Sequence, residues 1–256
     1  MLGRTHMAIG AVASVAVAPF IVHAPWDALR NFAQGREWQA ASGALVVQAL
    51  LVVAAVVGSL LPDLDQRNSL AARKVERVGQ VVAFVLMAAL LFLMHWQTHW
   101  VLWALAIVVS FALGANSNVA RRIGLGITGA GLLFLAVHGT IPMLGSILLA
   151  VWIVGAMFTE HRTFTHSLLG AALLVSGAFT VLDALGQMHG VPLSVAAWGL
   201  TVGYVLHLVA DSVAGGVPLL WPWNERQGIR LIRTGGLMDS LIGVVAACLC
   251  IVSVVV

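Results

Sequence analysis

Long apolar runs separated by short polar connections make up most of the chain. A helix needs about 20 predominantly apolar residues to cross a bilayer, with a range of about 17–25. Such runs lie at 7–22, 40–61, 78–96, 99–114, 123–138, 141–158, 164–186, 194–214 and 237–255. Isolated strands would leave backbone polar groups unsatisfied in lipid. The pattern therefore predicts an all-α fold, a polytopic transmembrane helical bundle of about nine spans.

The composition agrees with a chain whose outer surface is lipid. Of the 256 residues, 61% are hydrophobic and only 9% are charged, whereas a soluble domain carries about 25% charged residues. No polar connection is long enough to bury a core of its own, so residues 1–256 are predicted to form a single transmembrane domain. The first run is expected to be a retained helix, with a cleaved signal peptide as the alternative.

Arginine and lysine gather on one side of the predicted nine-span topology. The residues on that side are Arg4, Arg67, Arg73, Lys74, Arg77, Arg121, Arg122, Arg162, Arg226, Arg230 and Arg233. Only Arg30 and Arg36 fall on the other side. Because cytoplasmic loops carry the excess of positive residues, the N-terminus is predicted to be cytoplasmic. The expected location is the inner membrane, with several passes.

Two carboxylates stand at the end of the second predicted span. Asp63 and Asp65 follow Pro62, and the proline predicts that the helix ends near Leu61. The carboxylates would then lie on a turn at the membrane surface. An ordinary polar helix end explains them equally well.

A second polar cluster joins two spans on the same predicted side. The connection from Glu160 to His166 reads Glu-His-Arg-Thr-Phe-Thr-His. Two histidines, a carboxylate and an arginine are unusual for so short a loop, and histidine is a common ligand of zinc and similar ions. This composition favours a functional cluster over a plain loop. Thr163 or Thr165 is predicted to cap the helix that follows.

A third cluster lies inside an apolar run. His207 and Asp211 are four residues apart, a spacing that places both on one face of a helix. Ionisable residues within a span are costly and usually functional. The pair is therefore expected to point at one ion, with a structural hydrogen bond between the two as the alternative.

His6 and Asp239 stand at the starts of the first and last spans, on the same predicted face as the three clusters. Each has a simpler explanation, His6 as an interfacial residue and Asp239 as a carboxylate favoured by the helix dipole. The convergence on one face nevertheless predicts a metal site. Its predicted ligands are His6, Asp63, Asp65, His161, His166, His207 and Asp211, with Glu160 and Asp239 as possible supporting residues.

Five short motifs follow one another in order along the chain. They are Thr5-His6, Pro62-Asp63-Leu-Asp65, His161-Arg162-x-x-Thr165-His166-Ser167, Gly203-x-x-x-His207-x-x-x-Asp211, and Gly216-Val-Pro218 followed by Trp221-Pro222. Over residues 1–70 and 155–245, they resemble the YdjM-type family of LexA-regulated, inner-membrane metal-dependent hydrolases. That family is thought to be distantly similar to zinc-dependent phospholipases C and P1-type nucleases. Residues 78–140 carry no family motif and look like inserted spans.

Two departures from the family pattern bear on the site. Gln66 stands where the family often has histidine after Pro-Asp-x-Asp, which removes one ligand. The late Thr-Gly-x-x-Glu pattern appears as Thr234-Gly-Gly-Leu-Met-Asp239, with a shorter carboxylate.

The resemblance implies hydrolysis by a metal-activated water. One or two divalent ions, zinc or manganese, suit so many ligands, because a tetrahedral zinc takes four. A bound ion lowers the pKa of its water to about 7. Asp63, Asp65 and Arg162 are the predicted catalytic residues, and Arg162 is expected to pair with a phosphate more readily than Arg4.

The predicted depth of the site narrows the substrate. With His207 in the apolar layer, the expected substrate is a phosphoester or ester of a membrane lipid or lipid-linked molecule, and not a nucleic acid. A metal-ion or proton-coupled transporter is the alternative, since intramembrane His and Asp also form ion pathways. A non-catalytic membrane scaffold is the third possibility.

Overall fold

A computed structural model describes residues 1–22, 38–65, 84–85, 87–89, 91–92, 95–113, 118–160, 162–223, 225–229 and 231–255. These residues form helices and turns, with an isolated antiparallel bridge between Val217 and Gln227. The predicted all-α fold is confirmed. The chain divides into two compact units, the first from Met1–Pro62, Pro192–Leu219 and Glu225–Val256, and the second from Asp63–Val191 and Leu220–Asn224. The single transmembrane domain and the insertion at 78–140 stay predictions.

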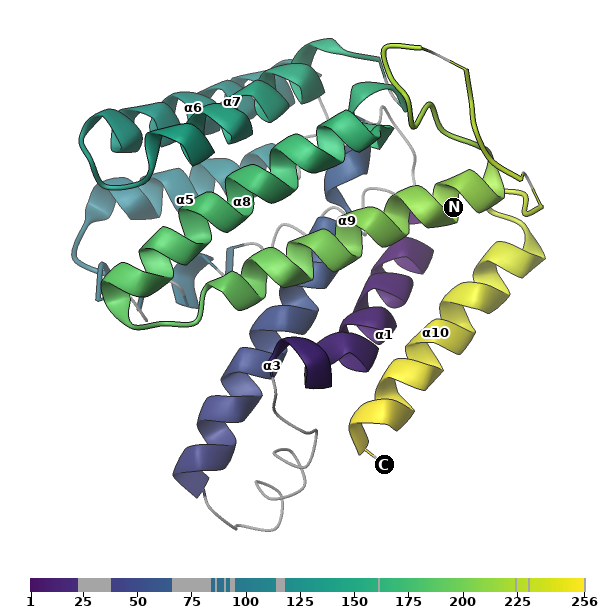
Figure 1. The fold of residues 1–256 in the computed structure, drawn as a ribbon, viewed down its shortest axis with the longest axis horizontal. Helices are drawn as coiled ribbons and strands as arrows, with labels where there is room; N and C mark the ends of the chain where they lie inside the picture. The colour runs from purple at the N-terminus through teal and green to yellow at the C-terminus, as the bar shows by residue number, and fades with distance from the viewer. Residues whose placement is uncertain are drawn as a thin grey trace. The chain divides into compact units, whose positions relative to one another are not determined.

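The first unit contains four long helices, α1 (Gly3–Ile21), α3 (Trp38–Gly58), α9 (Ser194–Ala214) and α10 (Leu237–Val255). Helix α1 contacts α3, α9 and α10, and α3 packs along α9 (Figure 1). The N-terminal ends of α1 and α10 lie together, because the backbone N–H of Leu2 donates to Asp239 Oδ2 over 2.9 Å. The two helices therefore run in parallel from a shared end.

Glycines bring α9 against α3 at backbone contact. A Cβ atom at Gly203 would lie 1.9 Å from the carbonyl oxygen of Ala55, and one at Gly199 would lie 2.4 Å from that of Leu51. The four-residue spacing of Gly199 and Gly203 matches the small-xxx-small pattern by which membrane helices approach closely. This packing fixes the end of α3 beside the C-terminal half of α9.

The second unit contains α5 (Trp100–Leu113), α6 (Asn118–Val137), α7 (Met143–Phe158) and α8 (Leu168–His189), each packed on the next. A short 3-10 helix, η2 (Phe164–His166), joins α7 to α8. Phe164 is anchored on α7, because a Cβ at Gly155 would lie 2.2 Å from its ring. The connection that holds the second polar cluster is thereby fixed within this unit.

The observed helices coincide with eight of the predicted spans, whereas most of 78–96 lies outside the described residues. Helix α3 ends at Gly58, three residues before the predicted end, and a 3-10 helix, η1, covers Leu61–Asp65. The proline explains the difference, because Pro62 has no N–H and its ring clashes with the carbonyl four residues earlier, that of Gly58. The α-helical pattern must therefore stop there.

Several helices have the length and composition of membrane spans. Within the described residues, those at Gly3–Ile21, Leu168–His189 and Ser194–Ala214 are long and apolar enough to cross a bilayer. Shorter apolar helices cover Gly43–Gly58, Trp100–Ser110, Gly124–Val137, Met143–Phe158 and Leu237–Ser253. Large apolar side chains such as Phe20 and Leu144 are well exposed, as expected where lipid is the solvent.

Candidate metal centre

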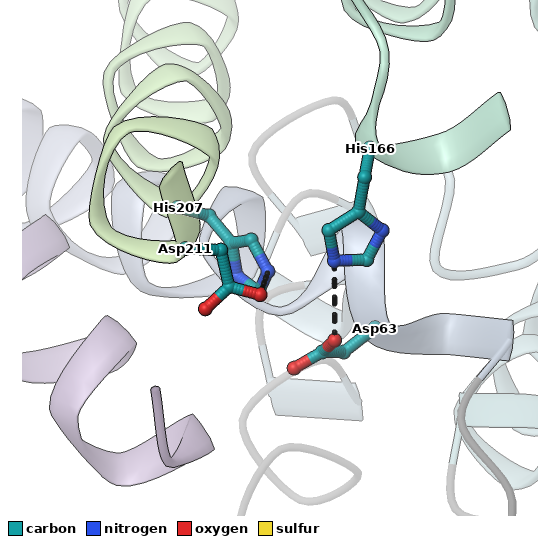
Figure 2. A group of neighbouring side chains, drawn as sticks. All are labelled: Asp63, His166, His207 and Asp211. Atoms are coloured by element: carbon teal, nitrogen blue, oxygen red, sulfur yellow. Dashed lines mark ion pairs between the residues drawn. The ribbon is translucent and has the colours of Figure 1, made fainter. Parts of the chain in front are cut away.

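His207 and Asp211 lie one turn apart on α9, and both side chains are buried. His207 Nε2 is 3.7 Å from Asp211 Oδ2, as Figure 2 shows. The prediction that the i, i+4 spacing places them on one face is confirmed. A buried imidazole and a buried carboxylate thus face each other inside an apolar helix of the first unit.

The hydrogen bond made by Nδ1 of His207 determines which of the two ring nitrogens carries the proton. His207 Nδ1 lies 2.7 Å from the carbonyl oxygen of Ser59, just beyond the end of α3. A carbonyl oxygen only accepts hydrogen bonds, so Nδ1 must be the protonated nitrogen. In the neutral ring, Nε2 then directs a lone pair toward the carboxylate of Asp211. Two lone-pair atoms facing each other are stabilised by a cation between them.

His6 completes this group from α1. Its ring stacks on that of His207, with centroids 3.7 Å apart and 18° between the planes. His6 Nε2 lies 3.1 Å from Asp211 Oδ1. The ring is buried, and Nε2 is the nitrogen that faces the carboxylate. With its proton on Nε2, the His6 ring would donate a hydrogen bond to the Asp211 carboxylate.

These three residues have the chemistry of a metal site. An imidazole and a carboxylate are ligand types of catalytic zinc, whereas the stacked ring of His6 directs its lone pair parallel to that of His207 and would have to turn to reach the same ion. A ligand histidine characteristically donates its second N–H to a backbone carbonyl, as His207 does to Ser59. The N-terminal amino group of Met1 also contacts Asp211 Oδ1, so a bound divalent ion would share or replace that contact. The group fits a divalent ion.

Asp239 holds the start of α1 in place. It is fully buried in the first turn of α10, and its Oδ2 accepts from Leu2 N at 2.9 Å and Gly235 N at 2.8 Å. Thr5 Oγ1 donates to the backbone carbonyl of Asp239 over 3.2 Å. These contacts flank His6, so Asp239 supports a residue of the group from a different helix.

Replacing Asp239 with alanine is expected to lower the stability of the protein by about 2 kcal/mol, because the N–H groups of Leu2 and Gly235 would lose a charged acceptor and hydrogen bonds to charged groups contribute about 1.5–3 kcal/mol. Unfolding in mixed detergent micelles measures the loss, and amide hydrogen exchange at residues 2–6 locates it. Asp183, which is exposed on α8, provides the control, and its alanine variant is expected to change stability by less than about 0.5 kcal/mol. Equal effects of the two variants would contradict the role given to Asp239.

A second imidazole–carboxylate pair lies in the second unit. His166 is buried at the end of η2, and its Nε2 is 3.5 Å from Asp63 Oδ1 (Figure 2). Thr165 Oγ1 lies 3.1 Å from His166 Nδ1. Asp63 is partly buried in η1. Both pairs drawn in Figure 2 therefore carry the ligand atoms that bind divalent ions.

The structure describes fewer contacts for the remaining predicted site residues. His161 lies outside the described residues, and Asp65 ends η1. Glu160 is exposed. Arg162 is partly buried and has a φ of 60°, a left-handed conformation that is uncommon for residues other than glycine.

The capping residue of α8 differs from the prediction. Neither Thr163 nor Thr165 caps this helix, because the side chain of Ser167 accepts from Gly170 N over 3.0 Å. The intervening η2 moves the start of α8 to Leu168. Ser167 is a preferred N-cap residue, and its place directly before the apolar run is the signal in the sequence.

Two features of the site escaped sequence reasoning. The first is the Ser59 carbonyl, which no residue type could reveal because it is a backbone group. The second is the Gly199–Gly203 spacing, which was present in the sequence as Gly-x-x-x-Gly and indicates close helix packing. Both features position the side chain of His207, and neither binds a ligand itself.

The fold and the buried residues define a class, that of all-helical membrane proteins with a histidine–aspartate group able to hold a metal ion. A family described as YdjM inner membrane protein matches residues 1–256. The chain belongs to this family, which confirms the resemblance found in its motifs and the membrane location. The curated proteins and solved structures compared with the chain contain no match.

Proposed function

We propose that the protein is a metal-dependent hydrolase that binds a divalent ion, preferably zinc, through His207 and Asp211, with His6 stacked beside them. The observation that carries the proposal is the orientation of His207. Its Nδ1 lies 2.7 Å from the Ser59 carbonyl, which leaves Nε2 facing Asp211. A divalent ion between these two atoms would be held by an imidazole nitrogen and a carboxylate oxygen, both common metal ligands. His6 stacks on the His207 ring and lies 3.1 Å from Asp211 Oδ1, so it supports this pair from α1.

The protein residues would orient the reaction from one side. Ser59 fixes the ring of His207, the stack with His6 fixes both imidazole planes, and Asp211 faces both Nε2 atoms. A divalent ion held by these residues would supply a water of lowered pKa and would polarise the oxygen of the bond to be cleaved. Because α9 is an apolar helix, bulk water is excluded from one side of this group. Water adds to the phosphorus or carbonyl carbon, and the alcohol leaves with the proton.

The pair of Asp63 and His166 in the second unit is proposed to supply ligands to a second divalent ion. Two considerations support this assignment. The pair repeats the imidazole–carboxylate chemistry of α9, and Asp63 follows Ser59 by only four positions in the sequence. Asp65 and His161 join the proposed set on the motif pattern alone. The distant similarity to zinc-dependent phospholipases C belongs to the same proposal.

A membrane lipid is the proposed substrate, cleaved at a phosphoester or ester bond near the cytoplasmic surface. The location of the group on membrane helices supports a substrate that reaches it from the bilayer. Arg162 is one proposed phosphate partner, since guanidinium binds phosphate in a fork geometry. Its left-handed backbone costs about 1 kcal/mol or more. Because the fold accepts this conformational cost at Arg162, the position supports a functional role for the arginine side chain.

We also propose that the chain crosses the membrane nine times, with a cytoplasmic N-terminus. Helices at eight of the nine predicted segments support the count. The excess of positive residues in alternate connections supports the orientation. Labelling of single cysteines placed in these connections, from each side of the membrane, tests both.

Removal and return of the metal tests the proposed function. The purified protein in lipid nanodiscs is expected to contain bound zinc or manganese and to hydrolyse a member of a phospholipid panel. A chelator should lower the rate to background, and the returned ion should restore it, because the ion supplies the reactive water. His207→Ala should lose both properties.

The matched control is His138→Ala, which removes an exposed histidine on another helix end and is expected to change neither metal content nor rate. Two results would sink the proposal. One is full activity of metal-free protein, and the other is metal content and activity that His207→Ala leaves unchanged. Metal uptake into proteoliposomes without hydrolysis would instead identify a transporter.

A further inference from the structure

An apolar groove runs between α1 and α10 of the first unit. Val12 of α1 lines it on one side, and Leu241, Ile242, Val245, Ala246 and Leu249 of α10 line the other. Its volume is about 330 Å³, within the range of small-ligand sites. The lining residues are all apolar, so the groove suits a hydrocarbon chain and offers no partner to a polar group.

A positive charge stands at the head of this groove. Arg4 is exposed near the start of α1, and its guanidinium donates to Ser240 Oγ over 3.1 Å. Ser240 directly precedes Leu241, the first lining residue of α10. Arg233, also exposed, lies in the segment that leads into α10. The groove therefore begins at a cation and continues along apolar side chains.

The inner wall of the groove touches the helix that carries the metal group. Ile242 packs against a buried cluster of Met1, Ala210 and Ala214, and Ala210 is the residue before Asp211. Arg4 lies two residues before His6 on α1. Both walls of the groove are thus directly connected to residues of the His6–His207–Asp211 group.

We propose that this groove binds one acyl chain of an anionic phospholipid, with the lipid phosphate paired to Arg4. The chemistry of the groove matches both parts of this ligand, the acyl chain and the phosphate. The acyl chain fits the apolar lining, and guanidinium binds phosphate by charge and by paired N–H groups. In a bilayer, the head groups of lipids lie at the level of helix ends and their chains lie along the helices. The parallel ends of α1 and α10 present Arg4 and the groove in this same order.

The inference deepens the proposed function, on which its catalytic meaning rests. A lipid seated here would have its phosphate beside Arg4, close along α1 to His6 and the proposed metal. The groove would then select substrates by a long acyl chain and a negative head group. Lipid binding itself, however, requires no turnover and is measured separately.

Photolabelling tests the site directly. The full-length protein in nanodiscs is irradiated with phosphatidylglycerol that carries a diazirine on one acyl chain, and labelled peptides are mapped. We expect labels on α1 and α10 at the lining residues. Val245→Trp, which fills the groove from a half-exposed position, should reduce this labelling by about tenfold, since each excluded methylene lowers affinity several-fold.

The matched control is Val252→Trp, which changes an equally exposed valine of α10 outside the groove and should leave labelling unchanged. Phosphatidylcholine with the same acyl chain should label less than phosphatidylglycerol, and Arg4→Gln should remove that difference. Unchanged labelling in Val245→Trp overturns the site. Equal labelling by the two lipids in the native protein overturns the anionic preference, and crosslinks between two chains at the groove would identify a second copy as its occupant.

The two proposals fail separately. Labelling that persists in His207→Ala and in the native protein, without any hydrolysis, leaves the groove in place and overturns the hydrolase. Hydrolysis of long-chain lipid that Val245→Trp does not affect, together with diffuse labelling, overturns the groove and leaves the hydrolase.

Discussion

Asp211→Asn is expected to lower zinc affinity by at least about 100-fold, the upper range for changes to residues that merely support metal ligands. The substitution keeps the size of the side chain and removes its negative charge. Asp211 is the carboxylate that faces both His6 and His207, so its loss removes an anionic ligand from the centre of the group. Competition with a chromophoric chelator measures the affinity, and hydrolysis should fall in parallel.

Asp183→Asn serves as the control for this result. Asp183 also lies on an apolar helix, but it is exposed and accepts a hydrogen bond from Gln187. Its variant should bind zinc like the native protein. Native zinc affinity in Asp211→Asn would show that the ion, if bound, lies elsewhere.

The second large effect is expected from one methyl group, in Gly203→Ala. The new Cβ would lie 1.9 Å from the carbonyl oxygen of Ala55 and 2.7 Å from the amide nitrogen of Ser59. A flexible side chain could change rotamer to relieve such a clash, but these are backbone atoms, so α9 must move away from α3. Overpacking costs about 1–3 kcal/mol and occasionally more, and here we expect the upper end. The movement also separates His207 from the Ser59 carbonyl, so zinc affinity should fall as well.

Gly43→Ala provides the comparison within the same helix pair. Gly43 lies on α3 with nothing within 4 Å of the added atom. There, alanine should leave stability unchanged or raise it by up to about 1 kcal/mol, because alanine favours the helix over glycine. Unfolding in mixed micelles and metal content are measured for both variants. Equal behaviour of Gly203→Ala and Gly43→Ala would contradict the close approach of α3 and α9.

The spacing of apolar and polar residues made the helices and the His207–Asp211 pair predictable. Long apolar runs identify helices because lipid leaves few other choices, and the four-residue spacing of His207 and Asp211 fixes a common face whatever surrounds it. The second polar cluster was likewise recognisable, because its composition is unusual for a loop. These inferences depend on local geometry alone.

The remaining features depend on tertiary packing and were not predictable in detail. That His6 stacks on His207 follows from how α1 packs on α9, and their separation of about two hundred residues gives no signal of it. Asp239 was expected to be a supporting residue, yet its actual contacts are with the backbone of Leu2 and Gly235. Backbone partners such as the Ser59 carbonyl are invisible in a sequence, since every residue has one.

The contacts of Asp239 have a consequence for biosynthesis. Helix α1 leaves the ribosome before α9 and α10, but the residue that holds its start belongs to α10. Until α10 has been inserted, the segment around His6 lacks this support, even though α9 already carries His207 and Asp211. The group is therefore completed only after α10 has been synthesised. For the proposed lipid hydrolase, this order of synthesis would delay the assembly of the reactive centre in a partly made chain.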